Sequence, residues 1–198
     1  MVCKMNLNDY VKVIDNSLSL DVCKKLIDLY HNPVAEDKKV HFQRNQSPNY
    51  TLLNFTENIK MDTSLHRECE LAALDAIKKY KAEVRDASWW PSVYGFEQFR
   101  IKYYRNNDDD MFKTHVDSAT FSSSKRFLLF FWYLNDVDEG GETTIDNLGI
   151  KIKPRTGRLV MFPPYWMYPH TGLKPVSGPK YLLSTYLHFI KEDGSVNS

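Results

Sequence analysis

The spacing of apolar residues divides the chain into a helical first half and a strand-rich second half. Residues 10–15 alternate like a short strand. From Leu20 the apolar positions recur at helical spacing, which predicts a helix of about 12 residues ending near Asn32-Pro33. A second helix is predicted from Leu65 to Tyr80. Its apolar stripe would consist of Leu65, Leu71, Leu74, Ile77 and Tyr80, and would pack against the outside of a sheet.

The second half reads as strands separated by turns. Residues 97–104 alternate between two faces, residues 127–135 form an almost unbroken apolar run typical of a buried strand, and residues 181–189 predict a last strand. Between the two predicted helices, residues 33–58 are polar and irregular, which predicts a long loop.

Composition narrows the class of protein. A chain of 198 residues fits one globular domain, and the formal charge of +1 shows no footprint for binding nucleic acid. Cys3, Cys23 and Cys69 lack metal-ligand spacing and are expected to be reduced thiols. The beginning of the sequence has no apolar signal core, and no apolar run reaches the roughly 18 residues of a membrane span. We therefore predict a cytoplasmic protein without membrane contact.

Candidate chemistry centres on His115 and Asp117. Alternation along a strand places both side chains on one face, with Val116 turned away, so the two can bind one ion. A lone His-x-Asp pair also occurs as an ordinary surface pair. With His170 as a third ligand, however, the set matches the facial triad of two histidines and one carboxylate that binds non-haem Fe(II).

Further motifs follow the His-x-Asp pair in a fixed order. They are Tyr133-Leu134-Asn135, Gly140-Gly141-Glu142-Thr143, a turn around Gly157, and His170 with Lys180 ten positions later. This order resembles the prolyl 4-hydroxylase-like branch of the 2-oxoglutarate- and Fe(II)-dependent oxygenase superfamily, over roughly residues 97–190. The resemblance implies an α+β fold with a double-stranded β-helix (jelly-roll) core and N-terminal helices against its major sheet. We expect one domain over residues 1–198, with the N-terminal strand and helices at about 8–85 and the jelly roll at about 95–190.

The resemblance also implies the site. His115, Asp117 and His170 would bind Fe(II), Lys180 would hold the C5 carboxylate of 2-oxoglutarate, and no catalytic residue is expected beyond the metal centre. A tyrosine of the 97–104 strand would assist Lys180. Apolar parity favours Tyr103, whereas the family residue directly before the turn favours Tyr104, so both remain candidates. O2 is the further co-substrate, and ascorbate a possible one. The position of the 33–58 segment makes four of its residues candidate substrate contacts: His41, Gln43, Arg44 and Tyr50. The alternative is that the segment is a solvated connector.

The leading function is hydroxylation of a C–H bond in peptidyl proline, with succinate and carbon dioxide as co-products. The alternatives are hydroxylation of a free amino acid or other small molecule, and oxidative demethylation of nucleic acid. The near-neutral charge argues against the last, as does the lysine at position 180 where such repair enzymes use arginine. A catalytically inactive binding module is disfavoured because it would not need the intact set of metal ligands. A zinc hydrolase is disfavoured because it would give Lys180 no function.

Overall fold

The computed structural model describes residues 6–42 and 47–191. In these ranges the helices are α1 (Leu20–His31) and α2 (Thr63–Glu83), with short 3-10 turns η1 (Leu7–Tyr10), η2 (Pro33–Lys38), η3 (Ile59–Met61), η4 (Arg85–Trp89), η5 (Phe121–Ser123) and η6 (Asp146–Leu148). The strands are β1 (Lys12–Ile14), β2 (Lys39–Phe42), β3 (Tyr50–Asn54), β4 (Tyr94–Phe96), β5 (Arg100–Tyr104), β6 (Phe112–His115), β7 (Arg126–Tyr133), β8 (Thr143–Ile145), β9 (Ile150–Ile152), β10 (Leu159–Phe162), β11 (His170–Gly172) and β12 (Lys180–Phe189).

Both predicted helices form and begin at side-chain caps. The Ser19 hydroxyl accepts from the Val22 N–H at the start of α1, and the Asp62 carboxylate accepts from the Leu65 N–H at the start of α2. The buried face of α2 differs from the predicted stripe, because Leu71 and Leu74 are about half exposed. Steps of three residues drift around a helix with 3.6 residues per turn. The face that packs on the sheet steps by three and four, and consists of Leu65, His66, Cys69, Ala73, Ala76, Ile77 and Tyr80.

The predicted loop over residues 33–58 is wrong, because this segment contains β2 and β3. Val40 lies opposite Leu52 in the antiparallel hairpin, and β3 pairs with β5. The hairpin extends the large sheet by two strands. Hydrogen bonds to β5 stabilise these short strands, and the sequence of the segment alone gives little indication of such tertiary pairing.

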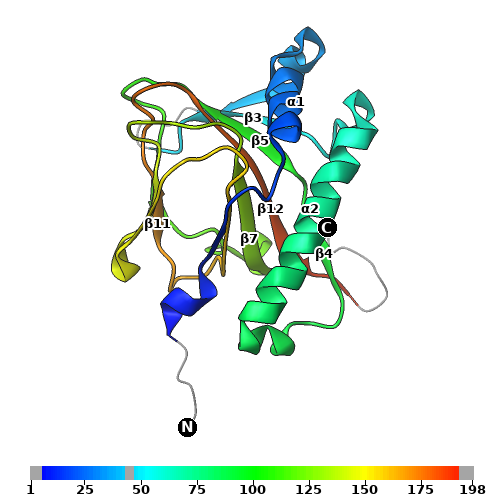
Figure 1. Cartoon of the computed structure of the whole chain (residues 1–198), viewed down its shortest axis with the longest axis vertical. Helices are drawn as coiled ribbons and strands as arrows, with labels where there is room; N and C mark the ends of the chain where they lie inside the picture. Colours follow the sequence, from blue (N-terminus) through cyan, green and yellow to red (C-terminus); the bar gives the residue numbers. More distant parts are fainter. Residues whose placement is uncertain (1–5, 43–46, 192–198) are drawn as a thin grey trace.

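In the described ranges, two antiparallel sheets face each other. The large sheet has the order β1-β10-β7-β12-β5-β3-β2, with β4 also paired to β12, and the small sheet has the order β6-β11-β8-β9. Figure 1 shows α1 and α2 on one side of the large sheet and β11 of the small sheet on the other. This is the jelly-roll arrangement expected from the sequence, with the helices covering the outer face of the major sheet.

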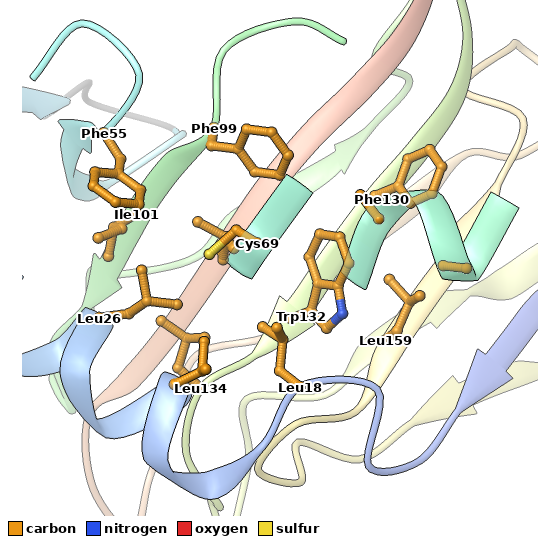
Figure 2. Packing of buried hydrophobic residues seen from close by; sticks show 14 of the residues in the cluster. Leu18, Leu26, Phe55, Cys69, Phe99, Ile101, Phe130, Trp132, Leu134 and Leu159 are labelled. Atoms are coloured by element: carbon orange, nitrogen blue, oxygen red, sulfur yellow. The ribbon is translucent and has the colours of Figure 1, made fainter. Parts of the chain in front are cut away.

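Strand β7 is buried on both faces, which explains its unbroken apolar sequence. Phe130 and Trp132 point into the core under the helices, whereas Phe131 and Tyr133 point between the two sheets. Figure 2 shows the first of these cores, where Leu26 of α1 and Cys69 of α2 approach the strand side chains. The helices and the large sheet therefore share one core.

Cys23 and Cys69 are buried free thiols, whereas Cys3 lies outside the described residues. Among the described helices, none combines the length and apolar character needed to cross a membrane.

Candidate metal centre and active site

Two strands of the small sheet bring His115 and His170 together. His115 ends β6 and lies directly opposite His170, the first residue of β11, so the two ring centroids are 4.2 Å apart. The Asp117 carboxylate lies between the rings, with Oδ1 3.6 Å from His115 Nε2 and Oδ2 3.4 Å from His170 Nε2. One potential ligand atom from each residue lies within 4.8 Å of the others. The structure thus unites the three side chains that the sequence selects.

Hydrogen bonds to the backbone fix the orientation of both imidazoles. His115 Nδ1 is 2.8 Å from the Lys113 carbonyl, and His170 Nδ1 is 3.1 Å from the Tyr168 carbonyl. A carbonyl oxygen only accepts, so each Nδ1 carries the proton and each Nε2 keeps a lone pair. The His115 ring also stacks on Phe112 at a centroid distance of 3.4 Å. Both Nε2 atoms are therefore presented toward the Asp117 carboxylate as potential metal ligands.

Asp117 carries the observation that tests whether a metal fits. Its Oδ2 is buried and has no hydrogen-bond partner in the described part of the chain. Burial alone would raise the pKa of this carboxyl, but in the metal-free site the charge of His170 and His115, when these rings are protonated, holds it well below its usual range. A buried carboxylate oxygen without a donor, next to the Nε2 atoms of two imidazoles, fits a divalent cation bound on one side with the other side open.

Arg126 supports the backbone at Asp117, a role that its position in the sequence does not predict. Its guanidinium donates to the Asp117 carbonyl at 3.0 Å and makes a bidentate pair with Glu97 at 2.7 and 2.9 Å. It also lies over the Tyr186 ring, 4.1 Å from the centroid. The arginine thus ties the residue after β6 to β7 and β12. Its sequence signal is weak, because it stands nine residues after Asp117 at the start of an apolar strand.

Lys180 lies at the start of β12, paired with Tyr104 of β5, and is only 1% exposed. Its ammonium donates to the Gly141 carbonyl at 3.1 Å and the Leu173 carbonyl at 2.9 Å, and lies 4.6 Å from the Tyr104 ring centroid. An ammonium has three donors, so one remains for a ligand. Burial lowers the pKa of Lys180 to about 7, against the opposing charge of Glu142. A carboxylate bound here would stabilise the charged form.

Gly141 allows this lysine to fit. Its φ of +74° favours glycine, and a Cβ at this position would lie 3.4 Å from Lys180 Cδ and 3.3 Å from Pro154 Cγ. The Gly140-Gly141 motif therefore gives a turn whose carbonyl reaches the lysine.

The structure brings Tyr104 to the cavity and turns Tyr103 away from it. Tyr104 lines the same cavity as the metal-ligand candidates, whereas the Tyr103 ring packs on Tyr181 at 4.8 Å and Tyr30 at 5.4 Å on the helix side. Of the two candidates that the sequence left open, Tyr104 is the one placed on the same cavity wall as Lys180. The alternation of apolar residues along β5 favoured Tyr103, but both faces of this strand are covered by other residues. Apolar character therefore does not identify the face that meets the cavity.

A second cation, Lys102, also lines the cavity and is not among the site residues predicted from the sequence. It shares the inner face of β5 with Tyr104, two residues away, and its Nζ lies 5.5 Å from the Tyr50 ring centroid. The remaining wall is mostly apolar or neutral, and includes Phe112, Leu129, Phe131, Thr143, Leu182, Ser184 and Tyr186.

The candidate substrate contacts are separated by the structure. Tyr50 packs on Tyr104 at 5.3 Å and on Phe112 at 6.0 Å, beside the cavity. His41 is exposed and contacts the Thr51 hydroxyl. Gln43 and Arg44 lie outside the described residues.

A cluster of two histidines and one carboxylate with an open side is the arrangement by which non-haem oxygenases bind Fe(II). Residues 99–188 match the family profile of the 2OG-Fe(II) oxygenase superfamily. The matched region contains His115, Asp117, His170 and Lys180, and this part of the chain is similar to a superfamily that uses 2-oxoglutarate and Fe(II). A search of the curated proteins finds no match.

Solved structures share the fold at low sequence identity. One is the 2OG complex of the viral collagen prolyl hydroxylase vCPH of Paramecium Bursaria Chlorella virus-1, with 20% identity, coverage of 92% of this chain and 97% of that one, and a TM-score of 0.66. A second is a prolyl hydroxylase from Trichoplax adhaerens in complex with a peptide fragment of the hypoxia inducible factor oxygen degradation domain, with 14% identity, coverage of 92% and 85%, and a TM-score of 0.71. A third is the non-heme alpha ketoglutarate dependent epimerase SnoN from nogalamycin biosynthesis, with 14% identity, coverage of 90% and 77%, and a TM-score of 0.64. At these identities the likeness concerns the fold.

Proposed function

We propose that the protein is an Fe(II)- and 2-oxoglutarate-dependent dioxygenase that hydroxylates a C–H bond. The observation that carries the proposal is the cluster of His115, Asp117 and His170 around a buried carboxylate oxygen without a donor. In this proposal the two Nε2 atoms and the Asp117 carboxylate hold Fe(II). With this metal bound, O2 would be the four-electron oxidant and would take two electrons from 2-oxoglutarate and two from the substrate C–H bond. Substrate, 2-oxoglutarate and O2 would then become hydroxylated substrate, succinate and carbon dioxide.

The chain's own residues bind and orient. Lys180 holds the C5 carboxylate of 2-oxoglutarate with its third N–H, because its other two donors already face carbonyls. The Tyr104 hydroxyl assists from the same wall. Burial raises the pKa of Tyr104 well above its ordinary value, so this hydroxyl stays protonated and can donate to a carboxylate. Leu129, Phe131 and Leu182 line the cavity with apolar surface.

For the substrate, the leading candidate is peptidyl proline, and ascorbate is the proposed reductant. The motif order and the likeness to two prolyl hydroxylases support this choice. A free amino acid or another small molecule is the second candidate, and the additional cation Lys102 in the cavity favours it. Nucleic acid is the least favoured, given the formal charge of +1.

Succinate release measured against matched substrates tests the proposal. Proline-rich peptides, free amino acids and oligonucleotides are each incubated with Fe(II), 2-oxoglutarate and O2, and the product is checked by mass spectrometry for one added oxygen atom. We expect substrate-stimulated succinate with a peptide or an amino acid, and none with His170→Ala. Release that no compound stimulates, or a product without added oxygen, would contradict the proposed hydroxylation.

A further inference from the structure

Lys102 is a cation that the described chain leaves without an anionic partner. Over residues 6–42 and 47–191 it forms neither an ion pair nor a hydrogen bond, and its strand neighbours on the two sides are Leu52 and Leu182. Its ammonium lies 5.5 Å from the Tyr50 ring centroid, and the Asp117 charge acts on it across the cavity without forming an ion pair. By contrast, the nearby Arg126 is paired with Glu97. An unpaired ammonium on an apolar wall is costly unless a ligand supplies the missing charge.

The two lysines of the cavity occupy different places. The Lys180 ammonium lies over the Tyr104 ring at 4.6 Å, and the Lys102 ammonium faces the Tyr50 ring at 5.5 Å. The two tyrosine rings are 5.3 Å apart. Lys180 is further held by two backbone carbonyls, so it cannot swing toward Lys102 without losing both hydrogen bonds. The cavity therefore offers two separate cationic points.

A count of the charges in the cavity indicates that 2-oxoglutarate would neutralise only one of the two lysines. Fe(II) and the Asp117 carboxylate together carry one positive charge, and the two lysines add two. The 2-oxoglutarate dianion would cancel two of these charges, with Lys180 holding one of its carboxylates. One positive charge remains beside the metal centre, on the side of Lys102.

We infer that Lys102 binds a free carboxylate of the primary substrate, which favours a free amino acid or the C-terminal residue of a peptide, proline included, over an internal prolyl residue. This inference rests on the proposed function and narrows its substrate class. Burial and the nearby Arg100 and Arg126 lower the pKa of Lys102 to about 8, while Asp117 opposes them. The ammonium form still predominates at pH 7, and a bound carboxylate would stabilise it.

Equilibrium binding without turnover tests this role. The common amino acids, proline included, are each titrated as free acid and as carboxamide into the anaerobic Fe(II)–2-oxoglutarate enzyme by calorimetry. We expect at least one acid to bind about tenfold to hundredfold more tightly than its amide, as for a charge-assisted hydrogen bond. Lys102→Met, which keeps the length without the charge, should abolish this preference. Lys102→Arg should retain it, and Lys102→Met should leave 2-oxoglutarate affinity within about threefold of wild type.

The opposite results are equally specific. The inference is overturned if no acid is preferred over its amide, if the preference survives in folded Lys102→Met, or if that variant loses 2-oxoglutarate as severely as Lys180→Met does. An acid preference confined to residues other than proline would refute the prolyl substrate and leave this inference standing. An internal prolyl peptide that binds equally to wild type and Lys102→Met would support the prolyl substrate and overturn the inference.

Discussion

Burial of Lys180 predicts that the affinity for 2-oxoglutarate depends on pH. The side chain is 1% exposed, and burial lowers the pKa of its ammonium to about 7. Only the charged form can give the co-substrate a charge-assisted hydrogen bond. Raising the pH above about 7 deprotonates the free enzyme, so binding must then take up a proton and becomes weaker.

The size of the effect follows from linkage. Each pH unit above the pKa of the free enzyme costs about 1.4 kcal/mol, or a factor of ten in affinity. The dissociation constant should therefore be roughly tenfold higher at pH 8 than at pH 6, and binding at pH 8 should take up roughly 0.9 proton. Glu142 is the charged group that opposes the lowering, and Tyr104 stays neutral throughout this range.

Calorimetry of the anaerobic Fe(II) enzyme in buffers of different ionisation enthalpy measures both quantities. Lys180→Met is the matched control. It should bind 2-oxoglutarate about tenfold to hundredfold more weakly at pH 6, with no slope between pH 6 and 8. Lys102→Met should keep the wild-type slope. A wild-type affinity that is constant from pH 6 to 8, without proton uptake, would refute the role assigned to Lys180.

Three other substitutions probe separate parts of the account. Tyr104→Phe should weaken 2-oxoglutarate binding by roughly threefold to tenfold, the value of one hydrogen bond, while Tyr103→Phe should leave it unchanged; the reverse order in a titration would restore Tyr103 as the inner residue. Arg126→Gln removes the guanidinium that holds the Asp117 carbonyl, so equilibrium dialysis should show Fe(II) affinity lower by about tenfold to hundredfold, and wild-type affinity would exclude this support. Trp132 is fully buried, and its indole N–H donates a hydrogen bond to the Ser17 hydroxyl at 3.1 Å. Trp132→Ala should lower the free energy of unfolding, measured in urea, by about 3–5 kcal/mol. A loss below about 1 kcal/mol would contradict its place in the core.

The sequence predicted best those elements whose local pattern and tertiary environment agree. Helix α1 has a serine cap and an apolar period, and β7 is an apolar run because both of its faces are buried. The motif order also predicted that residues 115, 117 and 170 would meet, which the facing of β6 and β11 produces.

The remaining features depend on tertiary contacts that a local pattern does not encode. The β2–β3 hairpin lies within a mostly polar, irregular segment, and β3 is stabilised as a strand by pairing with β5. The choice between Tyr103 and Tyr104 required knowledge of which face of a doubly covered strand meets the cavity. Lys102 could not be predicted for the same reason, because the sequence does not distinguish a lysine that faces a cavity from one that faces solvent.

The most direct test of the central claim is the visible spectrum of the anaerobic protein titrated with Fe(II) and 2-oxoglutarate. We predict a weak charge-transfer band that appears only when both are present, saturates at one Fe(II) per chain and is absent from His170→Ala. A folded wild-type protein that gives no band, or a His170→Ala variant that gives the same band, would contradict the assignment of His115, Asp117 and His170 as the ligands of one ferrous centre.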